Sequence, residues 1–258
     1  MKIITLPIGK DNFSYLLICR HSGSVAVIDP SEAQPVLDAV QKEDLNLEWI
    51  LCTHHHGDHI GGIAGLQSVF PDVKIGGAAV DQGRTPELNQ LFVDGTSFQV
   101  GNIAGHVIAT PGHTAGSVCY QFNNALFTGD TLFGAGCGRL FEGTAAEMFH
   151  SLNVKLPEHV DSETKLYFGH EYTEANLRFA RGVEPENQDI QMRLQNVCTS
   201  LQKGVFSTPS SWSEELDTNP FLRCTQPTVI DSAKRWAPEI ASTPTEIFRA
   251  IRDWKNHY

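Results

Sequence analysis

Residues 53–59 read THHHGDH, which gathers four imidazoles and one carboxylate within a few positions. Side chains on an extended chain alternate between two sides, so His54 and His56 are expected on one side. His55, between them, is expected to point away. Closely spaced imidazoles on one side of a loop are typical of a metal site, and His55 is predicted not to be a ligand.

A glycine interrupts the run before its last carboxylate and imidazole. Gly57 would allow a sharp turn, and such a turn would bring Asp58 and His59 towards a second point. The HxHxDH pattern therefore suits two adjacent metal positions better than one. The alternative is a surface patch of histidines, but the run directly follows a predicted strand.

In each of three later segments, a predicted strand is followed by a polar residue. TPGHT carries His113, FTGDT carries Asp130 and FGHE carries His170. Each is a weak signal alone, because a single histidine in a turn is more often solvated or structural. Their agreement with the HxHxDH run predicts that several strand ends contribute ligands to one centre.

Imidazole and carboxylate donors suit zinc, iron or manganese. Two such cations can share a water and lower its pKa from about 15.7 towards about 7, and they can polarise a carbonyl oxygen. Hydrolysis would then need no side-chain nucleophile. The 6 cysteines are dispersed without a CxxC pair and are expected to be free, buried thiols.

The elements that must position these residues begin with short apolar runs at residues 3–6, 15–18, 25–28 and 47–52, which predict strands. Helices are predicted at 32–42 and 61–70, with a strand at 73–75. Residues 96–130 are predicted to be all-β. A helix near 145–156 and a strand at 165–168 follow.

This order gives two similar halves, each with strands followed by helices. It predicts an α/β protein with an αββα sandwich of two facing sheets. Beyond residue 172, helices are predicted at 174–181, 189–202 and 245–257, separated by polar loops that contain prolines. We therefore expect a catalytic domain at 1–172 and a smaller helical domain at 173–258.

Composition narrows the class of protein. The 258 residues carry a formal net charge of -11, which argues against nucleic acid as the main partner. No apolar run approaches the roughly 20 residues of a membrane span, and the first residues do not read as a signal peptide. We expect a cytoplasmic protein, and a monomer.

In this order of motifs, the chain resembles the metallo-β-lactamase superfamily over residues 1–172: HxHxDH, a histidine in a PGHT turn, GD and GH. The resemblance implies a metallo-β-lactamase sandwich, and it implies that Asp29 supports the ligand loop, although a turn or helix-capping role is an equal alternative. It also implies two metal ions. One ion would be held by His54, His56 and His113, and the other by Asp58, His59 and His170. Asp130 would bridge the two ions.

Four segments look like those of the glyoxalase II family, the hydroxyacylglutathione hydrolases: GDTLFGAGCGRLFEGT, GHEYTEANLRFA, VEPEN and NPFLR. This resemblance extends into the helical domain. It implies hydrolysis of the thioester S-D-lactoylglutathione to D-lactate and glutathione, the second step of methylglyoxal detoxification. Asp58 and Asp130 would orient and bridge a metal-bound hydroxide.

The same resemblance implies residues that bind the small-molecule glutathione thioester: Arg139, Phe141, Tyr172 and Arg223. Some family members have tyrosine in place of Phe141, and some have a lysine shortly after the arginine of NPFLR. Both differences predict weaker binding of glutathione, or a compensating contact from another residue. For either arginine, an ion pair within the protein is the alternative.

The sequence motifs are also compatible with other functions. Another hydrolase of the superfamily, such as a general thioesterase, a lactonase or a β-lactamase, would use the same ligands. A mononuclear iron persulfide dioxygenase would need fewer of them. We expect two divalent ions, zinc first, with iron or manganese as alternatives.

Overall fold

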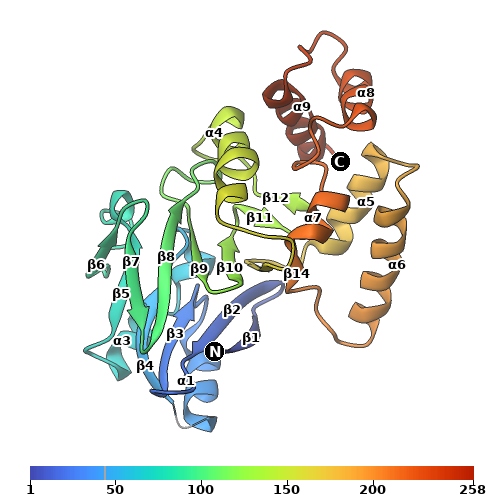
Figure 1. Ribbon diagram of the computed structural model, residues 1–258. Coiled ribbons are helices and arrows are strands. Elements are labelled where there is room, and N and C mark those ends of the chain that lie inside the picture. Colours follow the sequence, from blue (N-terminus) through green and yellow to red (C-terminus); the bar gives the residue numbers. More distant parts are fainter. Residues whose placement is uncertain (44) are drawn as a thin grey trace. The chain divides into compact units, whose positions relative to one another are not determined.

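The computed structural model describes residues 1–43 and 45–258, which form two compact units. Unit 1 contains residues 1–109 and 116–129, and unit 2 contains residues 110–115 and 130–258. The blue-to-red colouring of Figure 1 follows the chain through both units. The short segment 110–115, which includes His113, therefore belongs to the same unit as the C-terminal half.

The first sheet of unit 1 is mixed (Figure 1). Its strands lie in sequence order: β1 (Lys2–Ile8), β2 (Asn12–Ile18), β3 (Ser24–Ile28), β4 (Asn46–Leu51), β5 (Lys74–Ala78) and β6 (Gln90–Phe92). β1, β2 and β3 pair antiparallel, and β3 to β6 pair parallel. Carboxyl ends of parallel strands share one edge of a sheet, so the loops after β3, β4 and β5 are neighbours.

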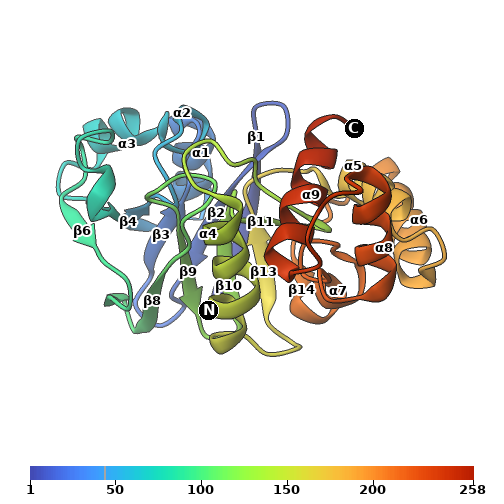
Figure 2. The ribbon, with the colours of Figure 1, turned by 90° about the horizontal axis from the view of Figure 1, so that it is seen from above.

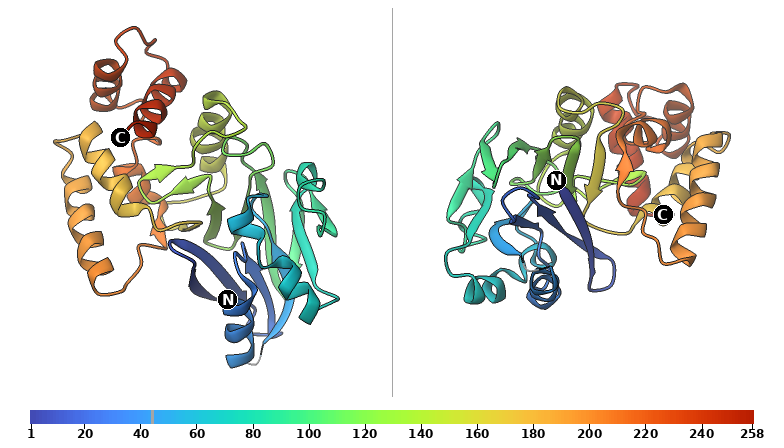
Figure 3. Two further views of the ribbon diagram at one scale, coloured as in Figure 1. Left: turned by 180° about the vertical axis from the view of Figure 1, so that it is seen from behind. Right: turned by 60° about the horizontal axis from the view of Figure 1, so that its bottom comes forward.

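Alternation along the strands explains how this sheet packs. Val25 and Val27 of β3 belong to a core cluster that also contains buried residues of α1 (Ala33–Lys42) and α3 (Ile63–Val69). Residues one position along, such as Ala26 and Ile28, are equally buried and must face the other way. Helices α1 and α3 therefore cover one face of the sheet, and the other face is free to meet a second sheet (Figure 3).

That second face meets four antiparallel strands of unit 1: β7 (Ser97–Val100), β8 (Ile103–Ala109), β9 (Val118–Phe122) and β10 (Ala125–Gly129). Tyr15 of β2 contacts Phe127 of β10, with ring centroids 5.5 Å apart. The buried Tyr120 hydroxyl donates to the Cys52 carbonyl oxygen at 2.7 Å. The predicted packing of two sheets face to face is confirmed within unit 1.

Unit 2 begins with a small hairpin of β11 (Leu132–Phe133) and β12 (Gly136–Cys137) and continues with α4 (Ala145–His150), which carries a capping box at Thr144. Strand β13 (Lys165–Phe168) pairs with β14 (Ser210–Ser211). Five helices follow β13: α5 (Thr173–Val183), α6 (Gln188–Gln202), α7 (Trp212–Thr218), α8 (Pro227–Trp236) and α9 (Pro244–Asn256). Figure 2 shows this group of helices from above, with α8 and α9 in red.

Several predicted elements differ from the structure. The helix predicted at 61–70 is α3, but a further helix, α2 (Gly57–Ile60), precedes it where only a glycine turn is predicted. The helix predicted near 145–156 changes to a π-helix at Ser151–Lys155. Helices α7 and α8 lie where only polar loops are predicted. Pro227 is the first residue of α8, a position where the missing N–H of proline costs nothing, so it starts a helix and does not end one.

Membrane insertion has no support in the helices. Among residues 1–43 and 45–258, no helix combines the length and the apolar character that crossing a bilayer requires. The longest, α6 at 15 residues, carries charged side chains at Asp189 and Arg193.

Candidate metal centre

The histidine run follows β4 directly, at the shared edge of the parallel strands. The Val118 N–H donates to the Thr53 carbonyl oxygen at 2.9 Å, which keeps the chain extended at the first histidine. His54 Nε2 and His56 Nδ1 then lie 3.1 Å apart on one side of the loop. The alternation predicted for these two imidazoles is therefore observed.

His55 takes the other side of the loop. Its Nδ1 lies 3.4 Å from Oδ1 of Asp81 and 3.4 Å from Nη1 of Arg84. The ring of His55 also meets that of His56 edge to face, with centroids 5.1 Å apart. Its Nδ1 is directed at charged side chains of unit 1, and that His55 is not a ligand stays a prediction.

Asp58 and His59 lie on α2, a single helical turn that starts at Gly57. Gly57 does not have the left-handed backbone that a glycine turn would use, because the change from strand to helix already redirects the chain. Asp58 Oδ2 lies 3.9 Å from Nε2 of His59 and accepts a hydrogen bond from Nδ2 of Asn12 at 3.2 Å. The sequence predicts the convergence of Asp58 and His59, but through a different local conformation.

The carboxylate of Asp29 contacts this loop at three atoms. Its Oδ1 accepts from the Thr53 N–H at 2.7 Å, and its Oδ2 lies 2.7 Å from Thr53 Oγ1 and 2.9 Å from His59 Nδ1. Asp29 is buried and has a left-handed backbone, with φ of 50°. A carboxylate on Nδ1 fixes the tautomer of His59 and leaves the lone pair on Nε2, a common arrangement for histidines that bind metal. The supporting role implied for Asp29 fits these contacts better than a turn or capping role.

Unit 2 presents the other three candidate ligands. Nε2 of His113 and Nε2 of His170 lie 3.6 and 3.4 Å from the same oxygen, Oδ2 of Asp130. His113 also has its Nδ1 2.8 Å from the Arg139 carbonyl oxygen, which sets its tautomer so that Nε2 carries the lone pair. Two imidazoles of unit 2 are thus directed at one carboxylate oxygen.

The turn before Asp130 requires a glycine. Gly129 has a φ of 48°, and a Cβ there would lie 2.2 Å from Oγ1 of Thr53. Both the backbone conformation and the space exclude a larger side chain. The GD pair of the motif thus has a steric reason, because it delivers the aspartate at the end of a strand.

Two exposed aromatic rings accompany the imidazoles of unit 2. Tyr172 stacks on His170, with centroids 4.7 Å apart and planes 3° from parallel. Phe141 contacts His113 edge to face at 5.2 Å. Phe141 is 62% exposed and Tyr172 37%, so both rings remain available to a ligand that reaches the imidazoles.

Basic side chains of unit 2 include two that the sequence motifs miss. The half-buried Lys255 lies in the electrostatic field of Arg252 and Arg139, and burial together with these charges lowers the pKa of Lys255 to about 8. Arg252 is 4% exposed and donates to the Cys137 carbonyl oxygen at 2.8 Å. Both residues lie on α9, in a part of the sequence where no motif draws attention to them, and the i, i+3 spacing of two cations is the only available signal.

Arg223 of NPFLR forms an ion pair with Glu184 of VEPEN. Nε donates to Oε2 at 2.7 Å and Nη2 to Oε1 at 3.1 Å, while Nη1 donates to the Leu216 carbonyl oxygen at 2.8 Å. The carboxylate is buried and also accepts from the Thr228 hydroxyl. This is the alternative role for Arg223, a pair within the helical region.

The hairpin that follows Asp130 is anchored by buried polar side chains of the helices. Glu215, 0% exposed, accepts from the Ala135 N–H at 2.7 Å and from Nη2 of Arg193 at 2.6 Å. Asn219 donates to the Gly136 carbonyl oxygen at 3.1 Å, and Asn176 donates to that of Gly134 at 3.0 Å. Three of the segments quoted for the family resemblance therefore meet at this hairpin.

The cysteines are free thiols, as expected. Burial raises the pKa of the Cys137 thiol, despite the nearby Arg252, and raises that of Cys52 strongly. A thiol with a raised pKa is a poor nucleophile near neutral pH. These two cysteines, close in sequence to the ligand loops, therefore have packing roles.

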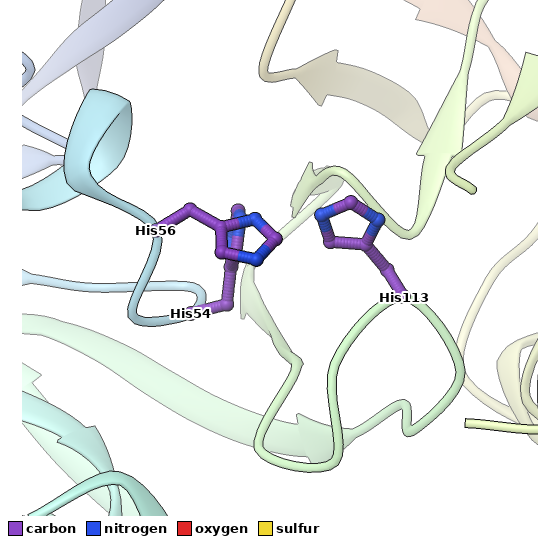
Figure 4. A group of neighbouring side chains, drawn as sticks. All are labelled: His54, His56 and His113. Carbon is purple, nitrogen blue, oxygen red and sulfur yellow. The ribbon is translucent and has the colours of Figure 1, made fainter. Parts of the chain in front are cut away.

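The donor chemistry of both units fits divalent metal ions. Nitrogen donors from buried imidazoles, and carboxylate oxygens beside them, form a mixed set that suits zinc and its neighbours in the first transition row. In each unit a histidine has its Nδ1 held by a carboxylate or a carbonyl oxygen. Figure 4 draws three of the imidazoles, His54 and His56 on the loop after β4 and His113 on its Gly-containing turn.

Two family models match the chain. The model described as "Metallo-beta-lactamase superfamily" matches residues 9–170, and the model described as "Hydroxyacylglutathione hydrolase C-terminus" matches residues 171–258. Together they cover the sandwich, the ligand motifs and the helical region.

Relatives match over the full length. A hydroxyacylglutathione hydrolase of Aeromonas salmonicida is 42% identical over 256 residues, 98% of each chain. One from a Synechococcus species is 42% identical over 268 aligned positions, 100% of each chain. Among solved structures, ETHE1 from Myxococcus xanthus is similar with a TM-score of 0.66 at 25% identity, covering 99% of this chain and 98% of that one.

Proposed function

We propose, on the premise that this chain belongs to the hydroxyacylglutathione hydrolase family of the metallo-β-lactamase superfamily, that it hydrolyses S-D-lactoylglutathione to D-lactate and glutathione. The observation that carries the proposal is full-length similarity that includes the helical region. The ligand motifs occur throughout the superfamily, whereas residues 171–258 match a model specific to this family.

We assign two divalent metal ions to seven side chains. His54, His56 and His113 would hold one ion, and the second would be held by Asp58, His59 and His170. Asp130 would bridge, since one of its oxygens already faces two imidazoles. We propose zinc because the nitrogen-rich donor set suits it, with iron or manganese as alternatives.

When bound, the two ions supply a water of lowered pKa and a Lewis acid for the thioester carbonyl oxygen. Asp58 and Asp130 would hold the ions and would orient that water through their carboxylates. The leaving thiol of glutathione has a pKa near the ordinary value of about 8.5, so it departs as a thiolate without a strong general acid. The neutral, buried Cys137 and Cys52 take no part.

Substrate binding is proposed for the exposed groups beside the imidazoles of unit 2. Phe141 and Tyr172 would pack against the acyl-thioester end, since their rings lie on ligand histidines. Glutathione carries two carboxylates, and Arg139 with Lys255 provides positive charge for them in a protein of net charge -11. Lys255 thus offers compensation for the lysine missing after NPFLR.

A contact between Arg223 and the tripeptide stays a prediction. All three nitrogens of its guanidinium already donate within the helical region. Comparison of Arg223→Met with Arg139→Met separates the two roles. A glutathione contact raises KM for the glutathione thioester alone, whereas loss of the Glu184 partner lowers the unfolding temperature and affects every substrate equally.

Lys255 gives the proposed binding a pH dependence. Because its pKa is about 8, the side chain is charged below that pH and becomes neutral above it. KM for S-D-lactoylglutathione is expected to rise by about tenfold, roughly 1.4 kcal/mol, as the pH passes through and above 8. Lys255→Met should show the raised KM at every pH.

Lys234→Met, which removes an exposed lysine of α8, is the matched control and should keep the pH profile of the unsubstituted enzyme. Steady-state kinetics from pH 6 to pH 9 give the comparison, with kcat followed separately from KM. A KM that stays constant in both enzymes, or shifts equally in both, removes Lys255 from the binding site.

The function itself is tested with four substrates for hydrolysis, with glutathione persulfide for oxygen uptake, and with a count of bound metal. We expect kcat/KM for S-D-lactoylglutathione to exceed that for an acyl thioester without the tripeptide by about 100-fold or more, since charge-assisted contacts to two carboxylates are lost. A lactone and a β-lactam should be poorer still. Preference for either of these, oxygen uptake with glutathione persulfide, or a single bound metal would overturn the assignment.

We further propose that residues 1–172 form the catalytic domain and residues 173–258 the substrate-binding domain, which the boundary between the two family models supports. A monomeric state and a cytoplasmic location stay predictions.

A further inference from the structure

Asp81 is a buried carboxylate that the proposed chemistry does not use. It ends a 3-10 turn, η1 (Ala79–Asp81), directly after β5, and only 3% of its surface is exposed. A buried charge is costly unless it is paired, so its surroundings must compensate. No sequence motif identifies it.

The carboxylate of Asp81 meets two charged or chargeable side chains. Its Oδ1 lies 3.4 Å from Nδ1 of His55 and 3.6 Å from Nη1 of Arg84. Arg84 is partly exposed and belongs to the same turn, whereas His55 comes from the metal loop. The contact with His55 therefore links η1 to the loop that carries His54 and His56.

The carboxylate of Asp81 occupies space that a side chain at position 116 would fill. A Cβ on Gly116 would lie 2.3 Å from Oδ2 and 2.5 Å from Cγ of Asp81. Gly116 lies in the PGHTAG segment, three residues after His113. The carboxylate is thus held against backbone on one side and His55 on the other.

Strand register explains why η1 and the metal loop meet. β4 and β5 are parallel neighbours, with Leu51 opposite Gly76, so their carboxyl ends lie at one edge of the sheet. The loop after β4 and the turn after β5 therefore lie side by side. The side chain at position 55 therefore reaches this turn through Nδ1, while its ring meets that of His56 edge to face at 5.1 Å.

We propose that Asp81 is a positioning residue for the metal centre. It holds Nδ1 of His55, and His55 in turn contacts the ring of His56, so that the rings of His54 and His56 stay together. The inference rests on the ligand assignment of the proposed function. In this proposal His55 is the side chain through which Asp81 fixes the loop, and His55 is not a metal ligand.

The competing interpretation is that Asp81 only stabilises the fold. In that case its removal lowers the unfolding temperature but leaves the folded protein with unchanged affinity for metal. A positioning role predicts weaker metal binding in the folded protein, because the ligands must be ordered at the moment of binding. The two interpretations therefore differ in metal affinity, not in stability.

The test is Asp81→Asn, which keeps the volume above Gly116 and removes the charge. Zinc affinity, measured by competition with a chromophoric chelator, is expected to fall by about tenfold, the lower end of the range for groups that contact a ligand directly, because Asp81 acts through His55. At saturating zinc, kcat should recover and KM for S-D-lactoylglutathione should be unchanged. Asp72→Asn, which removes an exposed carboxylate of unit 1, is the control and should bind zinc as the unsubstituted protein does.

A second variant, His55→Gln, keeps the inference falsifiable if Asp81→Asn does not fold. It should lose zinc affinity to a similar extent, and the double variant should be no weaker than the weaker single one, because both remove the same contact. Affinities within about twofold of the unsubstituted protein, or losses that multiply in the double variant, would overturn the proposal. Failure of the unsubstituted protein to bind two zinc ions or to cleave the thioester would instead count against the proposed function.

Discussion

Replacing Asp130 by alanine is expected to lower kcat for S-D-lactoylglutathione by about 10³-fold or more. Oδ2 of this carboxylate faces Nε2 of both His113 and His170, so its loss removes the proposed bridge between two metal positions. Metal-ion catalysis contributes several kcal/mol to transition-state stabilisation, and about 1.4 kcal/mol corresponds to each factor of ten. Steady-state kinetics with metal analysis of the same sample measure both effects.

Asp130→Asn is the informative companion, because the amide keeps the shape of the side chain but is a poor bridging ligand. Asp231→Asn, an exposed position on α8, controls for the loss of one negative charge. Retained turnover in Asp130→Ala with two metal ions still bound would contradict the bridging role. A folded variant with fewer than two ions and little activity would support it.

The second prediction with a large expected effect concerns the free energy of unfolding. Glu215→Gln should lower the free energy of unfolding by about 3–5 kcal/mol, since it leaves the buried guanidinium of Arg193 without its charged partner. This is a large part of the roughly 5–15 kcal/mol that typically stabilises a protein. Urea unfolding followed by circular dichroism gives the difference, and metal should be kept saturating throughout.

Two comparisons make this result specific. Glu239→Gln, at an exposed position after α8, should leave the urea midpoint unchanged. The double substitution Glu215→Met with Arg193→Met should recover part of the loss, because it removes both buried charges together. A Glu215→Gln midpoint equal to that of Glu239→Gln would show that the buried pair contributes little.

The candidate ligand residues stand out in the sequence because the pattern that marks them is local, whereas their grouping around two metal ions comes from the family resemblance and stays a proposal. His54, His55 and His56 follow from the period of two on extended backbone. His113, Asp130 and His170 each sit at the end of a short apolar run. Parallel and antiparallel strands deliver their ends to an edge, so a polar residue there signals a site without knowledge of tertiary packing.

Other features depend on contacts between distant parts of the sequence. Lys255 acquires its lowered pKa from burial and from charges on Arg252 and Arg139, none of which a linear pattern reports. Arg223 and Glu184 belong to two quoted motifs, yet only the fold shows that they pair. The start of α8 at Pro227 was available locally, because proline is favoured in the first turn of a helix.

The anchoring of the β11–β12 hairpin has a consequence for how the enzyme is made. This hairpin follows Asp130 directly, and its partners are Glu215, Asn219 and finally Arg252, close to the C-terminal end. A ribosome delivers these partners well after the hairpin, since chains emerge from the N-terminus. The segment after Asp130 therefore lacks these hydrogen bonds until synthesis has passed Arg252.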